Sequence, residues 1–127
     1  MAAAHFILFV ADQEKSTEFY SIVLGTEARL NVPGMTEFDL AEGAVLGLMP
    51  EVNANRLLSH RIQDSSGASL PARCELYLIV DNPKEVLQRA VLAGATLISP
   101  FEKRNWGHSA GYVSDLDGHI LAVASLQ

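Results

Sequence analysis

Short apolar runs and helical patterns follow one another along the chain, and their order occurs twice. The first copy starts with the apolar run His5–Val10, followed by a helical stretch that Asp12 caps and Gly25 ends. The second copy starts with the run Glu75–Val80, followed by a helical stretch that ends at Gly94. Runs of this length between turn residues are typical of strands, and apolar residues at helical spacing are typical of amphipathic helices. The offset of 70 residues at the strand and 69 at the glycine indicates a duplicated supersecondary unit.

Each helical stretch is followed by three short segments whose alternating residues predict strands. These are residues 27–31, 36–40 and 44–49 in the first copy, and 96–99, 111–114 and 119–125 in the second, where Pro100 is expected to end its strand. Residues 50–72 have loop composition, with a short helix predicted around 55–58. The sequence therefore predicts one compact α+β domain of two tandem βαβββ modules, over residues 1–50 and 74–127, joined by a linker loop over residues 51–73.

Composition narrows the functional classes. Hydrophobic residues make up 49% of the chain, which is enough for a packed core. The net charge of −6 disfavours nucleic acid and anionic membranes as partners. No apolar stretch approaches the roughly 20 residues that span a bilayer, and the first residues lack the pattern of a signal peptide. The single cysteine, Cys74, excludes an internal disulfide and fits a reducing compartment, so we expect a cytoplasmic protein.

Two groups of motifs in these modules resemble a known family. The first module has His5-Phe-Ile-Leu-Phe-Val-Ala-Asp12 and Phe19-Tyr20-x-x-Val23-Leu24-Gly25, and the second has Ala93-Gly94-Ala95, Trp106-Gly107 and Asp115-x-Asp117-Gly118-His119. In these the chain resembles the vicinal oxygen chelate superfamily, which includes glyoxalase I, bleomycin-resistance proteins and extradiol dioxygenases. The resemblance implies a cleft between curved mixed sheets and a homodimer. It is a poor guide to the reaction, because one fold hosts many functions.

The resemblance also implies four positions at which catalytic members of the family bind a divalent metal. His5 is the first of these positions and Glu75 the third, and both still carry a donor. The second falls at Gly47 and the fourth at Ala122, and neither side chain has a donor atom. Open metal sites in proteins generally need about three or four ligands. We therefore expect no cofactor, with a divalent metal at the remnant positions as the alternative.

Other residues are candidates for binding or proton transfer. His5 and Glu75 are either an ordinary ion pair or an acid–base couple. Trp106 is at the place where the resemblance puts the Trp-Gly pair of bleomycin-binding members. It either stacks on a planar or cationic ligand or packs its loop onto the sheet. Tyr112, Met35 and Phe38 either line the cleft or belong to the core. The segment Asp115–Gly118 is interpreted as a turn. His60 and His108 are predicted to lie in loops.

Two functions remain open on this basis. The first is a metal-independent protein of the glyoxalase and bleomycin-resistance type that binds and sequesters a small molecule. The lost donors at Gly47 and Ala122 and the Trp106-Gly107 pair favour it. The second is a metal-dependent lyase, isomerase or dioxygenase of the glyoxalase type, which the match around His5 favours. The chain is therefore either a binding protein or an enzyme, and a carboxylate found beside both His5 and Glu75 would favour the enzyme.

Overall fold

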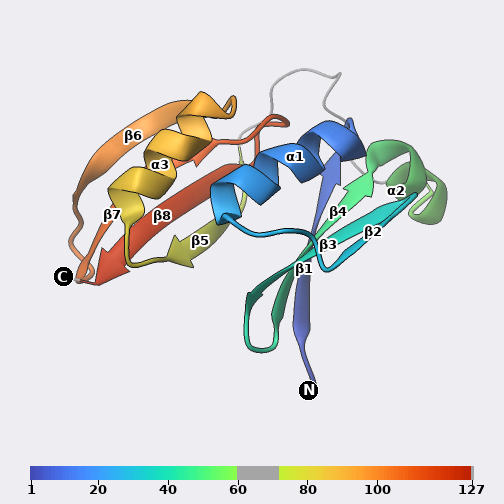
Figure 1. Cartoon of the computed structure of the whole chain (residues 1–127), viewed down its shortest axis with the longest axis horizontal. Helices are drawn as coiled ribbons and strands as arrows, with labels where there is room; N and C mark the ends of the chain where they lie inside the picture. The colour runs from blue at the N-terminus through green and yellow to red at the C-terminus, as the bar shows by residue number, and fades with distance from the viewer. Residues whose placement is uncertain (60–71, 127) are drawn as a thin grey trace. The chain divides into compact units, whose positions relative to one another are not determined.

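The computed structural model describes residues 1–59 and 72–126 (Figure 1). The remainder of the predicted linker, with His60, lies outside the described residues. Two compact units are present: one contains strands β1–β4, helix α2 and helix α1 as far as Ser21, and the other contains β5–β8 and α3. The predicted α+β fold of two tandem βαβββ modules is confirmed.

The first unit is a four-stranded mixed sheet with two helices. Its elements are β1 (Ala4–Val10), α1 (Gln13–Leu24), β2 (Leu30–Val32), β3 (Met35–Ala41), β4 (Ala44–Pro50) and α2 (Glu51–Leu57). The strand order is β1-β4-β3-β2, with β1 parallel to β4 and the other pairs antiparallel. The first and last strands of the module therefore pair with each other.

Helix α1 begins and ends where the sequence predicts. The Asp12 carboxylate accepts a hydrogen bond from the Lys15 backbone N–H at 3.0 Å, which satisfies a donor in the first turn. Gly25 adopts the left-handed conformation with φ of 69°, and its N–H donates to the Ser21 carbonyl. The Thr17 hydroxyl lies 2.8 Å from that of the buried Thr36 on β3. Helix α1 therefore lies against the face of the sheet that carries Thr36 and, by alternation, Phe38.

The second unit repeats this arrangement. Its elements are β5 (Glu75–Ile79), α3 (Pro83–Leu92), β6 (Thr96–Lys103), β7 (His108–Ser114) and β8 (Ile120–Leu126). The strand order is β5-β8-β7-β6, with β5 parallel to β8. Helix α3 packs on β6, β7 and β8 with Val86, Leu87 and Ala90 buried. A Cβ at Gly111 on β7 would lie 2.6 Å from Leu87 Cδ1, so glycine allows the helix to approach the sheet closely.

Equivalent residues pair in the same way within each of the two sheets. In the first, Ile7 is aligned with Gly47, and Gly47 with Glu37. In the second, Tyr77 is aligned with Ala122, and Ala122 with Tyr112. The duplication seen in the sequence therefore extends to the pairing of individual residues: Tyr77 occupies the place of Ile7, and Tyr112 that of Glu37.

Several predicted boundaries are wrong. Strand β6 continues through Pro100 to Lys103, because β6 is an edge strand and Pro100, which has no N–H, lies within the register shift between Ser99 and Glu102. His108 is the first residue of β7 rather than a loop residue. The strand predicted at 27–31 is β2 at Leu30–Val32, and the helix predicted near 55–58 is α2 at Glu51–Leu57. Among the described residues, no helix has the length and apolar character needed to cross a membrane.

Candidate functional site

Each sheet has a face opposite its principal helix, and we call these the opposite faces of the first and second sheets. The opposite face of the first sheet carries the side chains that alternate with Thr36 and Phe38, among them Glu37 on β3. The β1 residues His5 and Ile7 lie on the same face, because β4 pairs with both β1 and β3. In the second sheet the opposite face carries those that alternate with Gly111, among them Tyr112 on β7 and Tyr77 on β5. The opposite faces contain most of the candidate residues.

A charged cluster lies on the opposite face of the first sheet. Glu37 Oε2 lies 3.6 Å from His5 Nδ1, and Glu37 Oε1 accepts hydrogen bonds from Arg29 Nε at 3.0 Å and Nη2 at 2.9 Å. Arg29 Nη1 reaches Asp39 at 3.1 Å. The hydrogen bonds to Glu37, and to a lesser extent those to Asp39, raise the pKa of Arg29 against the opposing effect of burial. His5 therefore has a carboxylate neighbour, Glu37, that already binds a guanidinium.

The positions at which the family holds its metal do not form a donor set. His5 pairs with Val45, two residues before Gly47, and Glu75 pairs with Ile120, two residues before Ala122. Gly47 and Ala122 therefore occupy equivalent places in the two sheets. A Cβ at Gly47 would meet Cδ1 of Ile7, so a longer residue there would require the Ile7 side chain to shift. Ala122 is fully buried. Because only His5 and Glu75 of these four positions carry a donor atom, these residues do not fit the family's metal ion.

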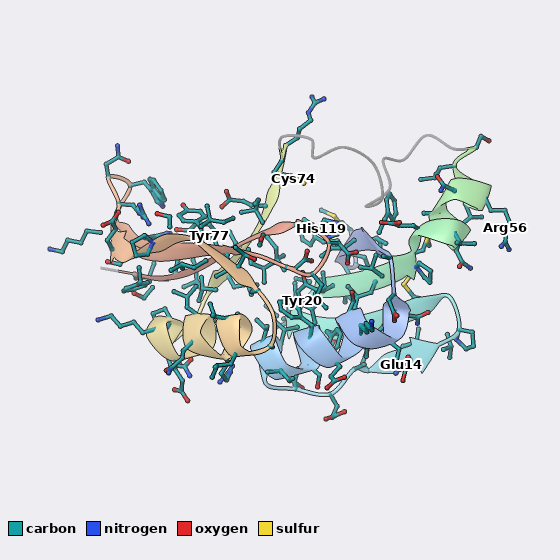
Figure 2. All side chains as sticks on the ribbon, turned by 90° about the horizontal axis from the view of Figure 1, so that it is seen from above. Glu14, Tyr20, Arg56, Cys74, Tyr77 and His119 are labelled. Atoms are coloured by element: carbon teal, nitrogen blue, oxygen red, sulfur yellow. The ribbon has the colours of Figure 1, made fainter. Side chains whose placement is uncertain are left out.

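An aromatic hydrogen-bonded chain lies on the opposite face of the second sheet. The indole Nε1–H of Trp106 donates to the hydroxyl oxygen of Tyr77 at 3.0 Å, and the same oxygen lies 2.7 Å from Nδ1 of His108. The rings of Tyr77 and His108 are 5.7 Å apart. The Trp106 side chain is 51% exposed although its N–H is engaged. Tyr77, which Figure 2 labels, thus connects an exposed indole to an imidazole.

Tyr112 lies on the same face, beneath an arginine. The guanidinium carbon of Arg104 is 5.2 Å from the centre of the Tyr112 ring. Burial, and then the charges of Glu75 and Tyr77, raise the pKa of Tyr112, while Arg104 lowers it. Arg104 donates to Ser99 Oγ at 3.0 Å and to the carbonyl oxygens of Pro100 and Ala110, each at 2.8 Å. Arg104 therefore fixes the irregular part of β6 against β7 and covers one side of Tyr112.

The remaining predicted site residues are Met35, Phe38 and Glu75. Met35 is half-buried on the opposite face of the first sheet beside Gly47, and Phe38 is fully buried on the face that α1 covers. In this structure Phe38 is a core residue. Glu75 is exposed at the start of β5, next to the exposed Cys74.

A shallow groove of about 480 Å³ lies between α1 and β2. It is lined by Gln13, Glu14, Thr17, Asn31, Val32 and Pro33. The Gln13 carboxamide bonds to the Val32 carbonyl, the Thr36 hydroxyl and the Gly34 N–H. The polar groups beside this groove hold α1 to the β2–β3 turn, and none of the predicted site residues lines it.

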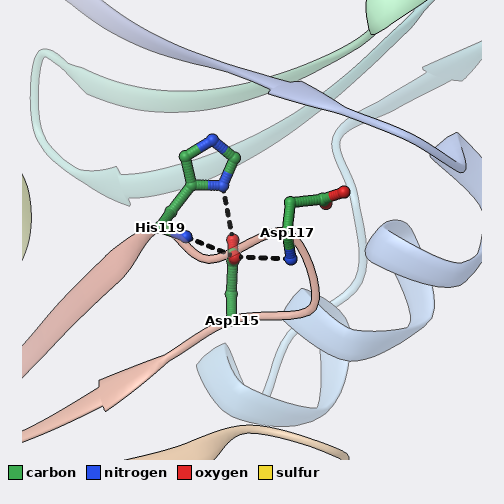
Figure 3. Close-up of side chains that lie close together, drawn as sticks. All are labelled: Asp115, Asp117 and His119. Atoms are coloured by element: carbon green, nitrogen blue, oxygen red, sulfur yellow. Dashed lines mark hydrogen bonds and ion pairs between the residues drawn. The ribbon is translucent and has the colours of Figure 1, made fainter. Parts of the chain in front are cut away.

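The turn between β7 and β8 places two carboxylates and an imidazole together (Figure 3). Asp115 Oδ1 accepts hydrogen bonds from the backbone N–H groups of Asp117 at 2.9 Å and His119 at 2.8 Å, and Asp115 Oδ2 lies 2.8 Å from His119 Nδ1. The Asp115 side chain is only 1% exposed. Because both of its oxygens bind groups of the turn, the geometry agrees with a structural turn.

Sequence reasoning missed Tyr77, His108 and Glu37. Tyr77 follows Glu75 by two residues, so strand alternation alone places it on the face that Glu75 shares. Glu37 is the counterpart of Tyr112 in the shared register. Transferring the Tyr112 prediction across the duplication would therefore have indicated Glu37, whereas the contact between Tyr77 and His108 depends on the strand order.

With this geometry in place, comparison with known proteins identifies the family. The sequence profile of the Glyoxalase/Bleomycin resistance protein/Dioxygenase superfamily matches residues 2–123. The chain belongs to this superfamily. No curated protein sequence matches it significantly.

Solved structures agree with the fold. A glyoxalase-related enzyme from Fulvimarina pelagi is 27% identical with a TM-score of 0.82, over 97% of this chain and 86% of that chain. A glyoxalase/bleomycin resistance protein/dioxygenase family enzyme from Burkholderia phytofirmans PsJN is 17% identical with a TM-score of 0.81, over 97% of both chains. A glyoxalase/bleomycin resistance protein from Albidiferax ferrireducens T118 is 16% identical with a TM-score of 0.72, over 96% of this chain and 97% of that chain. The last two likenesses concern the fold alone.

Proposed function

We propose that this protein is a metal-independent small-molecule binding protein that holds a planar ligand on the opposite face of its second sheet. One observation carries the proposal: Trp106 presents a half-exposed indole whose orientation is set by its hydrogen bond to Tyr77. An aromatic side chain that is already oriented loses little freedom when a flat ligand stacks on it, and stacking adds about 0.5–1.5 kcal/mol beyond the burial of surface.

Metal independence is supported by the residues at the family's metal positions. Gly47 has no side-chain donor atom, and Ala122 is a buried methyl group. On the first sheet, Glu37 already pairs with the guanidinium of Arg29. Binding a ligand at the second sheet requires none of these groups to hold an ion.

The proposal is tested by calorimetric titration with acetylnaphthalene, an uncharged flat aromatic probe. We expect binding to weaken about five- to thirtyfold in Trp106→Ala, which corresponds to about 1–2 kcal/mol. The matched control is Leu92→Ala, which removes an exposed apolar side chain of α3, on the other side of the sheet. Equal affinities of wild type and Trp106→Ala would refute the proposed site.

One observation favours a second function, a metal-dependent lyase, isomerase or dioxygenase. The Glu37 carboxylate lies 3.6 Å from His5, the first of the family's four metal positions. Glu37 is not one of these four positions, so it adds a donor atom beside His5. Purified protein without an affinity tag is titrated with Ni²⁺, Zn²⁺, Mn²⁺ and Fe²⁺, beside His5→Ala and Glu37→Gln. Under our proposal none binds stoichiometrically. One ion per chain, lost in both variants, would establish the metal site instead.

The family resemblance also supports a homodimer. Sedimentation equilibrium tests it directly: we expect twice the mass of the chain, and a monomer at micromolar concentration would contradict it.

A further inference from the structure

The Tyr77 hydroxyl is the junction of the chain Trp106–Tyr77–His108, and it has one hydrogen to donate. Its oxygen already accepts the indole N–H of Trp106 at 3.0 Å. The contact of 2.7 Å with His108 Nδ1 therefore has two forms. Either the Tyr77 O–H donates to a bare Nδ1, or Nδ1 carries a hydrogen and donates to the Tyr77 oxygen.

The protonation of His108 selects between these forms. A protonated imidazole has a hydrogen on both ring nitrogens, so Nδ1 can only donate. The Tyr77 oxygen then accepts from Trp106 and from His108, and its own hydrogen must point away from both. Histidine is the residue type that most often changes its charge between about pH 5 and 8 in proteins. The ionisable groups that share this face of the sheet are Glu75, Tyr77, Glu102, Arg104 and Tyr112.

We propose that Tyr77 is the specificity-determining residue of this face, donating a hydrogen bond to an oxygen acceptor of the ligand when His108 is protonated. The preferred ligand is therefore a flat conjugated molecule with a carbonyl or similar oxygen at its edge. Trp106 contacts the face of such a molecule, and the Tyr77 hydroxyl, held next to the indole by the Trp106 hydrogen bond, contacts its edge. This inference rests on the proposed function and adds the acceptor requirement and its dependence on pH.

The first test uses the protein without any ligand. Trp106 is the single tryptophan of the chain, so its emission reports on this hydrogen-bonded chain. We expect one emission transition in the pH range of imidazole titration, lost in His108→Gln and in Tyr77→Phe. Circular dichroism confirms that each variant is folded. A transition that persists unchanged in folded Tyr77→Phe would overturn the inference, because Tyr77 would then not connect the two rings.

The second test compares acetylnaphthalene with ethylnaphthalene, which has the same aromatic rings but lacks the carbonyl oxygen. Both probes are uncharged, so attraction between the ligand and a charged imidazole does not enter. Lowering the pH through the imidazole range should strengthen acetylnaphthalene binding about three- to tenfold, the value of one net hydrogen bond, and leave ethylnaphthalene binding unchanged. Tyr77→Phe should remove the difference between the probes.

The outcomes separate the two proposals. Suppose that both probes bind and both need Trp106, but that no pH-dependent preference for acetylnaphthalene is found. This result would overturn the inference and leave the proposed function intact. Binding that is insensitive to Trp106→Ala would overturn the proposed function and, with it, the inference.

Discussion

Replacing Asp115 by alanine should destabilise the second unit more than any other exchange of one acidic residue there. The Asp115 side chain is 1% exposed and binds three groups of the β7–β8 turn: two backbone N–H groups through Oδ1 and the imidazole of His119 through Oδ2. Alanine removes all three interactions at once. Because the turn connects two central strands, its loosening also weakens the pairing of β7 with β8.

The magnitude follows from these contacts. Hydrogen bonds to a charged group contribute about 1.5–3 kcal/mol each, but their contributions are not additive. The two backbone N–H groups belong to half-buried residues, so water replaces part of what is lost. We therefore expect the free energy of unfolding to fall by about 2–4 kcal/mol. Asp115→Asn keeps an oxygen for the N–H groups and should cost about 1 kcal/mol.

Urea unfolding followed by Trp106 emission measures the effect, since Trp106 belongs to the second unit. With a slope of about 2 kcal/mol per molar urea, Asp115→Ala should lower the unfolding midpoint by about 1–2 M. The exposed Asp81 provides the matched control, and Asp81→Ala should shift the free energy by less than about 0.5 kcal/mol. If Asp115→Ala and Asp81→Ala unfold at the same urea concentration, the assigned role of the turn is refuted.

Three further predictions concern other contacts. Arg104→Lys should lower the free energy of unfolding by about 1–3 kcal/mol in urea titrations, because an ammonium cannot reproduce the bonds to Ser99, Pro100 and Ala110; an unchanged midpoint would contradict this. The raised pKa of Tyr112 means that the folded state retains its proton longer, so stability should fall as the pH rises above about 10, and Tyr112→Phe should reduce that fall in alkaline urea titrations. Asp12→Ala should cost about 1 kcal/mol by removing the cap of α1, and a thermal melt equal to that of the wild type would exclude this.

The fold could be predicted because its signals are local and occur twice. The apolar runs around Ile7 and Tyr77, the cap at Asp12 and the turn glycine at Gly25 each indicate an element from a few neighbouring residues. The errors fall where a distant partner decides the outcome. Pro100 would end an isolated strand, but the register shifts of β6 and the bonds of Arg104 accommodate it.

The candidate site could be predicted only in part, for the same reason. Trp106 is a candidate because of its residue type and its place in the family pattern, and Tyr112 because it lies on a predicted strand that can line a cleft. Their neighbours Tyr77 and His108 are 31 positions apart and meet because β8 lies between β5 and β7. Likewise, nothing in the residues next to His5 indicates that Glu37 would lie beside it. Strand order is a property of the whole module, so single-residue patterns do not contain it.

The parallel pairing of the first and last strand in each module has a consequence for the order of folding. The hairpins β3–β4 and β7–β8 join neighbours in the chain, so they can form early. Residue 4 meets residue 44 in one sheet, and residue 75 meets residue 120 in the other, only after long loops have closed. Strands β1 and β5, which carry His5 and Tyr77, are therefore expected to join their sheets last. During synthesis, the first sheet has all its strands once Pro50 has left the ribosome, whereas the face around Trp106 must wait for β8.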